Sequence, residues 1–513
     1  EYSDYENRTY NTNYYASNAT LTYSPRLGDN HSLTVLAGWN VEEKQYMKTL
    51  AKRTGLLDSS KPNFSLMDGT DITLKDNGSY NWGLVGAFYR VSYSYKGKYL
   101  FETSGRYDGN SKFPTNQRWG FFPSGSIGWR ISEEGFMKNA NWLDNLKLRV
   151  SVGSAGNGLI SDTYAYLSTM SIAQSSLLNN GSVFNYTAAP SPIPDGLTWE
   201  TATTYDLGLD FEAFNGRLNF TADIYRKKTT DMYVVGEELP AVYGNNAPKG
   251  NYADMHTDGW EASLSWRDSH MVGGKPLSYN IKVSVWDNTS KITRYTSKTG
   301  TLPTNYKINY YQGMTLGEIW GYRCDGLFQS DEEAQTYANY SKFTNRSAKW
   351  SAGDPRYLDL NGDGYVNNGN NTIYDHGDLV KIGNTTPRYC YSIQGGVRWN
   401  GIGLSMMWQG VGKRDWYPAK ESGYFWGQYG RPYSMALPWH TTDRWSPTNR
   451  DAYWPRLVAY AACDTGTILS QPNTRYLQDA SYIRLKNLTI DYNFPKALIS
   501  KIGLQALKIY ITG

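Results

Sequence analysis

The sequence is poor in the residues that mark several common protein classes. Among 513 residues there are 3 cysteines and 5 histidines, and charged residues make up only 19%. Cys324, Cys390 and Cys463 are too few for a disulfide framework, although a pairing of Cys324 with Cys463 stays open in an oxidising compartment. The 51 basic and 47 acidic residues nearly balance and form no basic cluster, which argues against a nucleic-acid partner.

Long apolar runs, linkers and catalytic motifs are missing as well. No run of about 18 apolar residues exists, which excludes a membrane-spanning helix but not a barrel. No Pro/Ser-rich linker or charge block divides the chain, so one continuous body is favoured. The histidines are far apart in the sequence, and there is no zinc-protease motif, Walker A motif, GxGxxG or GxSxG. Nothing in the sequence indicates an enzyme.

The abundant residues are tyrosine, tryptophan and glycine. There are 44 Tyr, 18 Trp and 50 Gly, and the aromatic fraction is 15%. The mean hydropathy is nevertheless only −0.60. This combination is typical of transmembrane barrels, because their strands alternate lipid-facing and lumen-facing residues and their interfaces carry Tyr and Trp.

Alternation along short segments predicts the strands. In Tyr99–Tyr107, one face carries Leu100, Glu102, Ser104 and Arg106, and the other is mainly aromatic. In the segment 146–153, apolar residues alternate with Lys147, Arg149 and Ser151. A cation facing lipid at mid-membrane costs about 2–4 kcal/mol, so we expect these cations to face the lumen. The whole chain yields about 14 such strands, at residues 1–24, 31–45, 82–95, 99–107, 122–131, 146–153, 201–213, 217–226, 260–267, 279–287, 388–399, 403–412, 482–493 and 507–512.

Tight turns connect these strands in pairs. Asn215-Gly216, Gly273-Gly274 and Asn400-Gly401 have the residues that a type I′ hairpin turn requires, since both central positions need positive φ. These turns alternate with loops of about 15 to 90 residues, and residues 46–80 are predicted to be one of the loops. The predicted fold is all-β: a transmembrane antiparallel β-barrel with short periplasmic turns and long extracellular loops.

Several segments carry a specific resemblance to a known family. RYDGNSKF at 106–113 and RWGFFPSGSIGWRISEEGFM at 118–137 closely resemble the signature of the SusC/RagA family of TonB-dependent outer-membrane transporters. The resemblance continues at 146–157, 199–233, 317–333, 359–383, 444–457 and 480–495. It covers most of the chain from about Asn81 onward and is weaker before that residue.

The resemblance implies a function and partners. Family members import glycan or peptide fragments across the outer membrane of Gram-negative bacteria, together with a SusD-like surface lipoprotein that caps the barrel, and TonB supplies the energy through a plug domain. A dimer of transporter–lid pairs is a further expectation. Residues 1–513 would be the barrel portion of a roughly 22-stranded barrel, with the plug and the terminal strands absent. The absence of a signal peptide and of an initiating methionine fits a mature or truncated piece.

One segment has the spacing of a calcium loop. Asp359, Asn361, Asp363 and Asn367 place side-chain oxygens at positions 1, 3, 5 and 9, Gly364 lies at the sharp turn, and Tyr365 would supply a carbonyl oxygen at position 7. Position 12 is Asn370 instead of the usual Glu, although Asp375 or Asp378 could fold back to supply the missing carboxylate ligand. One interpretation is a Ca²⁺ site that rigidifies an extracellular loop; the alternative is a turn cluster that needs no ion.

The region 413–479 is crowded with aromatic residues, and a loop of that length without a function would be unusual. Aromatic faces stack on sugars and anchor protein interfaces, so these side chains are candidates for contact with a ligand or with the lid. The selected candidates are Trp416, Tyr424, Trp426, Tyr429, Trp439 and Trp445. The alternative is that they pack against each other to fold the loop.

Two other functions stay open. One is a passive porin or adhesin barrel, which would work without an energy source. The other is a secreted carbohydrate-binding β-protein, which could be purified without detergent. The sequence does not distinguish glycan from peptide substrates.

Overall fold

The computed structural model describes residues 4–76, 78–158, 160, 163–168, 170, 172–179, 182–187, 190, 192–194, 196–236, 239–240, 242, 247–296, 299–304, 308–337 and 350–513. Antiparallel strands dominate these residues. Within them, no helix has the length and apolar character needed to cross a membrane.

Among the described residues, fifteen strands form the main sheet, and fourteen of them follow one another along it in sequence order. They are β1 (Asp4–Tyr23), β2 (His31–Thr54), β4 (Tyr80–Tyr95), β5 (Tyr99–Asn110), β6 (Trp119–Arg130), β7 (Leu143–Asn157), β10 (Glu200–Ala213), β11 (Leu218–Val235), β12 (Lys249–Val272), β13 (Lys275–Tyr295), β18 (Arg388–Trp399), β19 (Ile402–Lys413), β22 (Tyr482–Asn493) and β23 (Lys508–Thr512). The fifteenth strand, β3 (Ile72–Asp76), pairs with β2.

Smaller elements lie in the connections. The remaining strands form two-stranded sheets: β8 (Ile172–Asn179) with β9 (Ser182–Thr187), β14 (Glu318–Gly321) with β17 (Val380–Asn384), β15 (Cys324–Leu327) with β16 (Pro355–Tyr357), and β20 (Asp415–Trp416) with β21 (Gln478–Asp479). The α-helices are short: α1 (Asp331–Thr336), α2 (Gly423–Trp426), α3 (Pro438–Thr442) and α4 (Lys496–Ile499).

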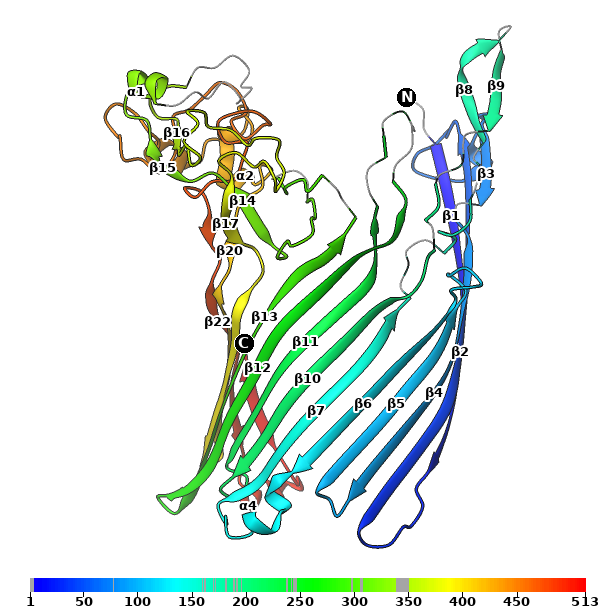
Figure 1. The fold of residues 1–513 in the computed structure, drawn as a ribbon, viewed down its shortest axis with the longest axis vertical. Coiled ribbons are helices and arrows are strands. Elements are labelled where there is room, and N and C mark those ends of the chain that lie inside the picture. Colours follow the sequence, from blue (N-terminus) through cyan, green and yellow to red (C-terminus); the bar gives the residue numbers. More distant parts are fainter. Residues whose placement is uncertain are drawn as a thin grey trace. The chain divides into compact units, whose positions relative to one another are not determined.

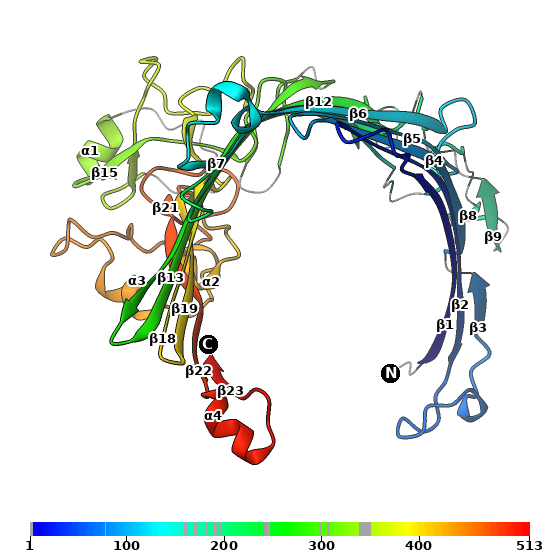
Figure 2. The same cartoon turned by 90° about the horizontal axis from the view of Figure 1, so that it is seen from below.

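The chain divides into two compact units, whose boundary crosses β7, β10, β11 and β12. Unit 1 comprises residues 1–136, 147–207 and 227–253. In it, β2, β4, β5 and β6 run side by side, and the β8–β9 hairpin lies beyond the end opposite the tight turns (Figure 1). Viewed along the strands, β1, β2, β4 and β5 follow a continuous curve (Figure 2).

Unit 2 comprises residues 137–146, 208–226 and 254–513. It contains β13, β18, β19, β22 and β23, which pair in that order. The small sheets β14–β17 and β15–β16 and the helices α1 and α2 gather at one end of these strands, and α4 lies at the other end (Figure 1). The connections β13–β18 and β19–β22 of this unit therefore lie at the same end of its strands.

The strand register separates two faces in each unit. In unit 1, Val35 lies opposite Val91, and Thr34 lies opposite Ser92. In unit 2, Tyr279 pairs with Val397 on one face, whereas Lys282 pairs with Gln394 on the other. Because strand side chains alternate, the matched register produces one apolar and one polar face.

The apolar face of unit 1 has aromatic residues towards both strand ends. Tyr99 and Trp129 form a cross-strand pair at the tight-turn end. Towards the other end, Tyr107 stacks on Trp119 with ring centroids 5.1 Å apart. Ile127 lies between these two positions and is 58% exposed in this chain. An exposed apolar band flanked by aromatic residues is the surface that a membrane covers.

The predicted hairpin turns are confirmed by their backbone angles. Asn400 has φ 47° and Gly401 has φ 87°, and both residues of the Gly273-Gly274 turn also have positive φ. Asn215 and Gly216 likewise have positive φ, and Asp144 accepts a hydrogen bond from Gly216 N at 2.8 Å. Glycine is favoured at such positions because it has no Cβ to clash.

All fourteen predicted strands are present, but several extend further than predicted. Residues 46–80 were expected to form a loop; instead β2 continues to Thr54, and β3 pairs with this extension. Strand β12 begins at Lys249, eleven residues before the predicted start at Trp260. In these extensions each face mixes polar and apolar residues, so no alternation marks the strand. Cys324 and Cys463 are thiols in this structure and form no disulfide.

Candidate functional site

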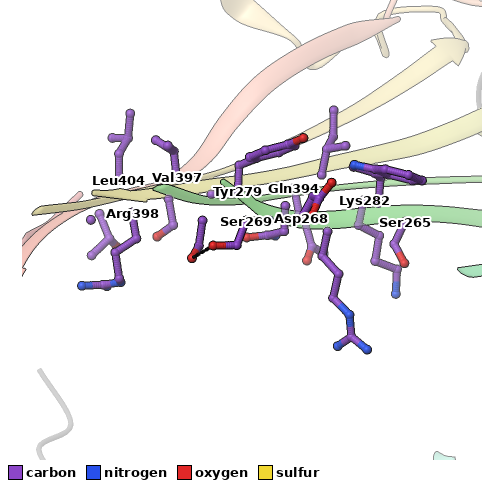
Figure 3. Close-up of a pocket in the computed structure, with 18 of the residues that line it drawn as sticks. Ser265, Asp268, Ser269, Tyr279, Lys282, Gln394, Val397, Arg398 and Leu404 are labelled. Carbon is purple, nitrogen blue, oxygen red and sulfur yellow. Dashed lines mark hydrogen bonds between the residues drawn. The ribbon is translucent and has the colours of Figure 1, made fainter. Parts of the chain in front are cut away.

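The polar face of unit 2 contains a groove of about 910 Å³. Arg398, Lys282 and Ser265 project into it from one side of the sheet, while Val397 and Leu404 project from the opposite side (Figure 3). Arg398 Nη2 donates to both oxygens of Asp491, at 2.6 and 2.9 Å. The groove is therefore a solvent-accessible, charged surface on the side of the sheet opposite its apolar face.

Unit 1 has a second groove on its polar face, of about 500 Å³. Lys147, Arg149 and Ser151 line it, as expected from the alternation in β7. Ser92 and Glu102 lie on the same surface and are joined by a hydrogen bond of 2.6 Å. The two cations thus face away from the apolar surface, which spares them the cost of facing lipid.

Two long connections of unit 2, between β13 and β18 and between β19 and β22, fold together into a structure that we call the loop domain. A parallel bridge joins Tyr322 to Asn473, and Tyr322 N donates to Pro472 O at 2.9 Å. One apolar cluster takes buried residues from both connections. The fully buried Asp354 of the first connection accepts two hydrogen bonds from Arg456 of the second. The two connections therefore form a common core.

Aromatic side chains make up much of this core. Trp454 stacks between Tyr429 and Tyr476, with centroid distances of 5.6 Å on both sides and 14° between the planes in each case. His440 packs edge-on against Trp454 at 4.7 Å and is fully buried. Its Nε2 lies 2.6 Å from Phe425 O, and since a carbonyl oxygen only accepts, Nε2 carries the proton. Burial lowers the pKa of the His440 imidazole below its usual 6.5.

The buried carboxylate of Glu318 joins several segments of the loop domain through hydrogen bonds. Glu318 accepts hydrogen bonds from Lys381 Nζ at 2.7 Å, Tyr311 Oη at 2.5 Å and Thr315 N at 2.9 Å. Burial alone opposes its ionisation, but these hydrogen bonds outweigh burial and lower the pKa of Glu318. Burial also raises the pKa of Tyr311, which therefore stays a proton donor.

The six aromatic candidates separate into buried and exposed residues. Trp426 and Tyr429 are each only 1% exposed and belong to the loop-domain core, as the packing alternative expects. Trp416 and Trp439 are each 45% exposed, and Tyr424 is 83% exposed. The sixth candidate, Trp445, is partly buried, packs against Gly353, and its Nε1 makes no hydrogen bond within the described part of the chain. The exposed three are therefore the ones available to a ligand or partner.

Three further exposed side chains were not among those candidates. Tyr433, Met435 and Tyr374 are 84%, 74% and 79% exposed. Tyr433 and Met435 lie between α2 and α3, close in sequence to Tyr424 and Trp439. No local pattern distinguishes them from the buried aromatics, because burial here depends on how the two connections pack.

Backbone amides of the predicted calcium loop donate to its side chains. Asp359 accepts from Gly362 N at 2.7 Å and from Gly364 N at 2.9 Å, through different oxygens. Asp363 Oδ1 accepts from Tyr365 N at 2.8 Å. Carboxylate oxygens keep further lone pairs after accepting one N–H, so these oxygens retain the capacity to bind a cation.

Asp378 closes this loop and is fully buried. It accepts from Leu360 N at 2.8 Å and from Asn367 N at 2.9 Å, and so ties the start of the loop to its end. Asn361 and Asn367 accept from backbone amides two residues further on. Among the described residues, no group of three or more His, Cys, Asp or Glu side chains has metal-binding geometry, so an ion here would need amide and carbonyl oxygens beside the carboxylates.

Comparison with known proteins identifies the family. The family model "TonB dependent receptor-like, beta-barrel" matches residues 1–510. TonB-dependent receptor P3 of Formosa agariphila is 27% identical over 516 residues, which cover 98% of this chain and 48% of the relative. TonB-dependent receptor SusC of Bacteroides thetaiotaomicron is 28% identical over 375 residues, covering 71% of this chain and 34% of the relative.

Solved structures agree on the fold. The structure of the RagAB peptide transporter matches with a TM-score of 0.76 at 19% identity, covering 100% of this chain and 52% of that chain. The RagAB peptide importer in its open-open state matches with a TM-score of 0.74 at 19% identity, covering 100% of this chain and 51% of that chain. This chain thus spans about half the length of the relatives that it matches. It belongs to the TonB-dependent receptor β-barrel family, is of the SusC/RagA type, and is an outer-membrane protein of a Gram-negative bacterium.

Proposed function

We propose that this chain forms the membrane wall of a nutrient importer driven by TonB. The observation that carries the proposal is the family match over residues 1–510, on a sheet whose strand register separates an apolar face from a polar one. The apolar face would meet lipid, and the grooves containing Lys147 and Arg398 would face the lumen. TonB would act on a plug domain of the whole protein.

A surface lipoprotein of the SusD type is the proposed partner. Trp416, Tyr424 and Trp439 support this assignment, because they are exposed aromatic side chains on a loop domain whose core is already filled. Aromatic anchors of this kind commonly dominate protein interfaces. The lid and the wall would trap a glycan or peptide fragment between them, and two such pairs would form a dimer.

The role that we propose is non-catalytic. Each histidine has a structural contact: His31 with Tyr93, His256 with Asp258, His270 with Tyr279, His376 with Trp320 and His440 with Phe425. These contacts support positioning roles for the histidines.

Calcium binding by the loop 359–367 is a secondary proposal. An ion held by Asp359 and Asp363, with oxygens of Asn361, Tyr365 and Asn367, would rigidify the loop that Asp378 already closes. Calorimetric titration with Ca²⁺ tests it, and an Asp359→Asn variant should lose the binding heat. Titration heats equal to those of buffer would contradict it.

Uptake measurements on the full-length protein test the main proposal. Cells expressing it should accumulate a labelled nutrient, and a protonophore should abolish accumulation, because TonB draws on the proton gradient. If the labelled nutrient only reaches its external concentration, and the protonophore has no effect, the result would instead support the passive porin. Native mass measurement of the detergent-extracted complex should also find a second, lipoprotein-sized species; a lone species would contradict the proposed lid.

A further inference from the structure

The polar face of unit 1 carries a cluster of lysines and tyrosines near the end of the strands that bears the long connections. We call it the lysine–tyrosine wall, formed by Tyr10 on β1, Lys44, Tyr46 and Lys48 on β2, Tyr80 on β4 and Lys112 after β5. The register places Tyr10 directly opposite Lys48, and Tyr46 directly opposite Tyr80. Strand pairing thus brings these residues together on one face.

The rings of the wall form a stack with a cation near each end. Tyr46 and Tyr80 stack with centroids 4.9 Å apart, and Tyr10 lies 6.5 Å from Tyr46. Lys48 Nζ lies 5.5 Å from the Tyr10 ring, and Lys44 Nζ lies 5.6 Å from the Tyr80 ring. Because these contacts occupy ring faces, the groups left to meet a ligand include the phenol O–H and ammonium N–H donors.

Lys112 is held in place from several sides. Its Nζ donates to Ile160 O at 2.9 Å and lies 5.5 Å from the ring of Trp82. Its backbone N donates to Asn110 Oδ1, and the next residue, Phe113, is fully buried. Burial lowers the pKa of Lys112; the nearby Tyr80 opposes this shift, and the positive charge of Lys44 adds to it. The ammonium groups of Lys44 and Lys112 therefore repel each other.

The nearby carboxylates are already engaged elsewhere. Asp4 pairs with Lys52 and Glu6 with Arg8, and Glu42 accepts a hydrogen bond from Tyr14 Oη at 2.8 Å. Within the described residues, Lys44, Lys48 and Lys112 form no ion pair with a carboxylate. Glu42 keeps its negative charge, because its donor Tyr14 is neutral, and it offsets part of the lysine charge. The net positive potential that remains is one that an anion relieves.

We propose that the lysine–tyrosine wall binds the anionic groups, carboxylate or sulfate, of the substrate that this protein imports. The inference rests on the proposed function and narrows its substrate to an acidic class. Ammonium and phenol donors arranged along one face suit an extended ligand with repeated oxyanions. An acidic oligosaccharide and an acidic peptide share this chemistry, and the experiment separates them.

The test measures calorimetric binding to the full-length protein with its partner. The acidic probes are tetragalacturonate and tetraglutamate, and the neutral probes are maltotetraose and tetraglutamine. We expect one acidic probe to bind and its neutral counterpart to bind at least about tenfold more weakly. Binding should also weaken as salt rises, because screening shortens the reach of the lysine charges. The acidic probe that binds identifies the source of the anion.

A matched pair of variants ties the effect to the wall. Lys44→Gln/Lys48→Gln should weaken binding of the acidic probe about tenfold or more. Lys52→Gln also removes a positive charge from the same face of β2. Because Lys52 is already paired with Asp4, the Lys52→Gln variant should bind the acidic probe about as tightly as the unaltered protein does. As a folding control, all variants should be present in the outer membrane in equal amounts.

Two results would overturn the inference. One is equal binding by the wall variant and the Lys52→Gln variant; the other is equal binding of acidic and neutral probes. Protonophore-sensitive uptake of the native nutrient is measured in parallel. If that uptake persists while the acidic preference is missing, the wall assignment fails and the import proposal stands; if uptake does not respond to the protonophore, the import proposal itself fails.

Discussion

Arg456 donates two hydrogen bonds to Asp354, 102 residues away in the sequence, from Nε to Oδ1 at 2.7 Å and from Nη2 to Oδ2 at 3.0 Å. Asp354 is fully buried, so this pair joins the two connections of the loop domain through a carboxylate that water does not reach. Arg456→Ala would leave the carboxylate buried without its partner. We expect this to destabilise the loop domain by about 3–5 kcal/mol, measured by hydrogen exchange in residues 415–479.

A more exposed ion pair is the control for that variant. Arg356 bonds Asp325 and Glu333, but all three side chains are partly exposed. Arg356→Ala should therefore cost only about 0–1 kcal/mol. Equal effects of the Arg356 and Arg456 changes would contradict the role assigned to burial.

Stability of the loop domain should fall as the pH drops below 6.5. Burial holds the pKa of His440 below its usual 6.5, so the unfolded form takes up a proton at a higher pH than the folded form does. The contribution is complete above pH 6.5 and is lost as the pH falls through the folded pKa. Hydrogen exchange of α3, corrected for intrinsic rates, should be faster at pH 5.5 than at pH 7.5. Unchanged protection would show that His440 does not couple folding to pH.

Exposed and buried aromatics of the loop domain should behave differently. Tyr424→Ser and Trp439→Ser should reduce copurification of the lipoprotein while leaving protease resistance unchanged, since both side chains are exposed. Trp426→Ala should instead cost about 3–5 kcal/mol of loop-domain stability, because it empties a filled core position. Full retention of the lipoprotein by the Tyr424 and Trp439 variants would remove these residues from the proposed interface.

Two neighbouring residues of β7 test which face meets lipid. Val150 lies opposite Ile127 on the apolar face, and Ser151 lies opposite Ser126 on the polar face. Val150→Arg should destabilise the protein in bilayers by about 2–4 kcal/mol. Ser151→Arg should stay within about 1 kcal/mol of the unaltered protein, because it adds to a charged groove. Denaturant unfolding in vesicles measures both, and a reversed order would exchange the assigned faces.

The strands could be predicted from sequence where their two faces differ in polarity. The segment 99–107 alternates because one face is polar and the other apolar, and it lies within β5 as predicted. The extensions of β2 to Thr54 and of β12 back to Lys249 were missed because each of their faces mixes polar and apolar residues. Alternation of polar and apolar residues therefore shows where the two faces of a strand meet different environments, but it does not show where the strand ends.

The candidate site was less predictable, for a different reason. Tyr424 and Trp426 are two residues apart in α2, yet one is 83% exposed and the other 1%. That difference arises from packing against Trp454 and Tyr476, which come from a later part of the chain. The lysine–tyrosine wall was missed likewise, since its members become neighbours only through strand pairing.

The most direct test of the import proposal compares uptake in two strains that carry equal amounts of the full-length protein, one with TonB and one without it. The account predicts that the strain with TonB accumulates the nutrient against its gradient and that the strain without TonB does not. Equal accumulation in both strains would contradict the central claim that this chain is the wall of a TonB-driven importer.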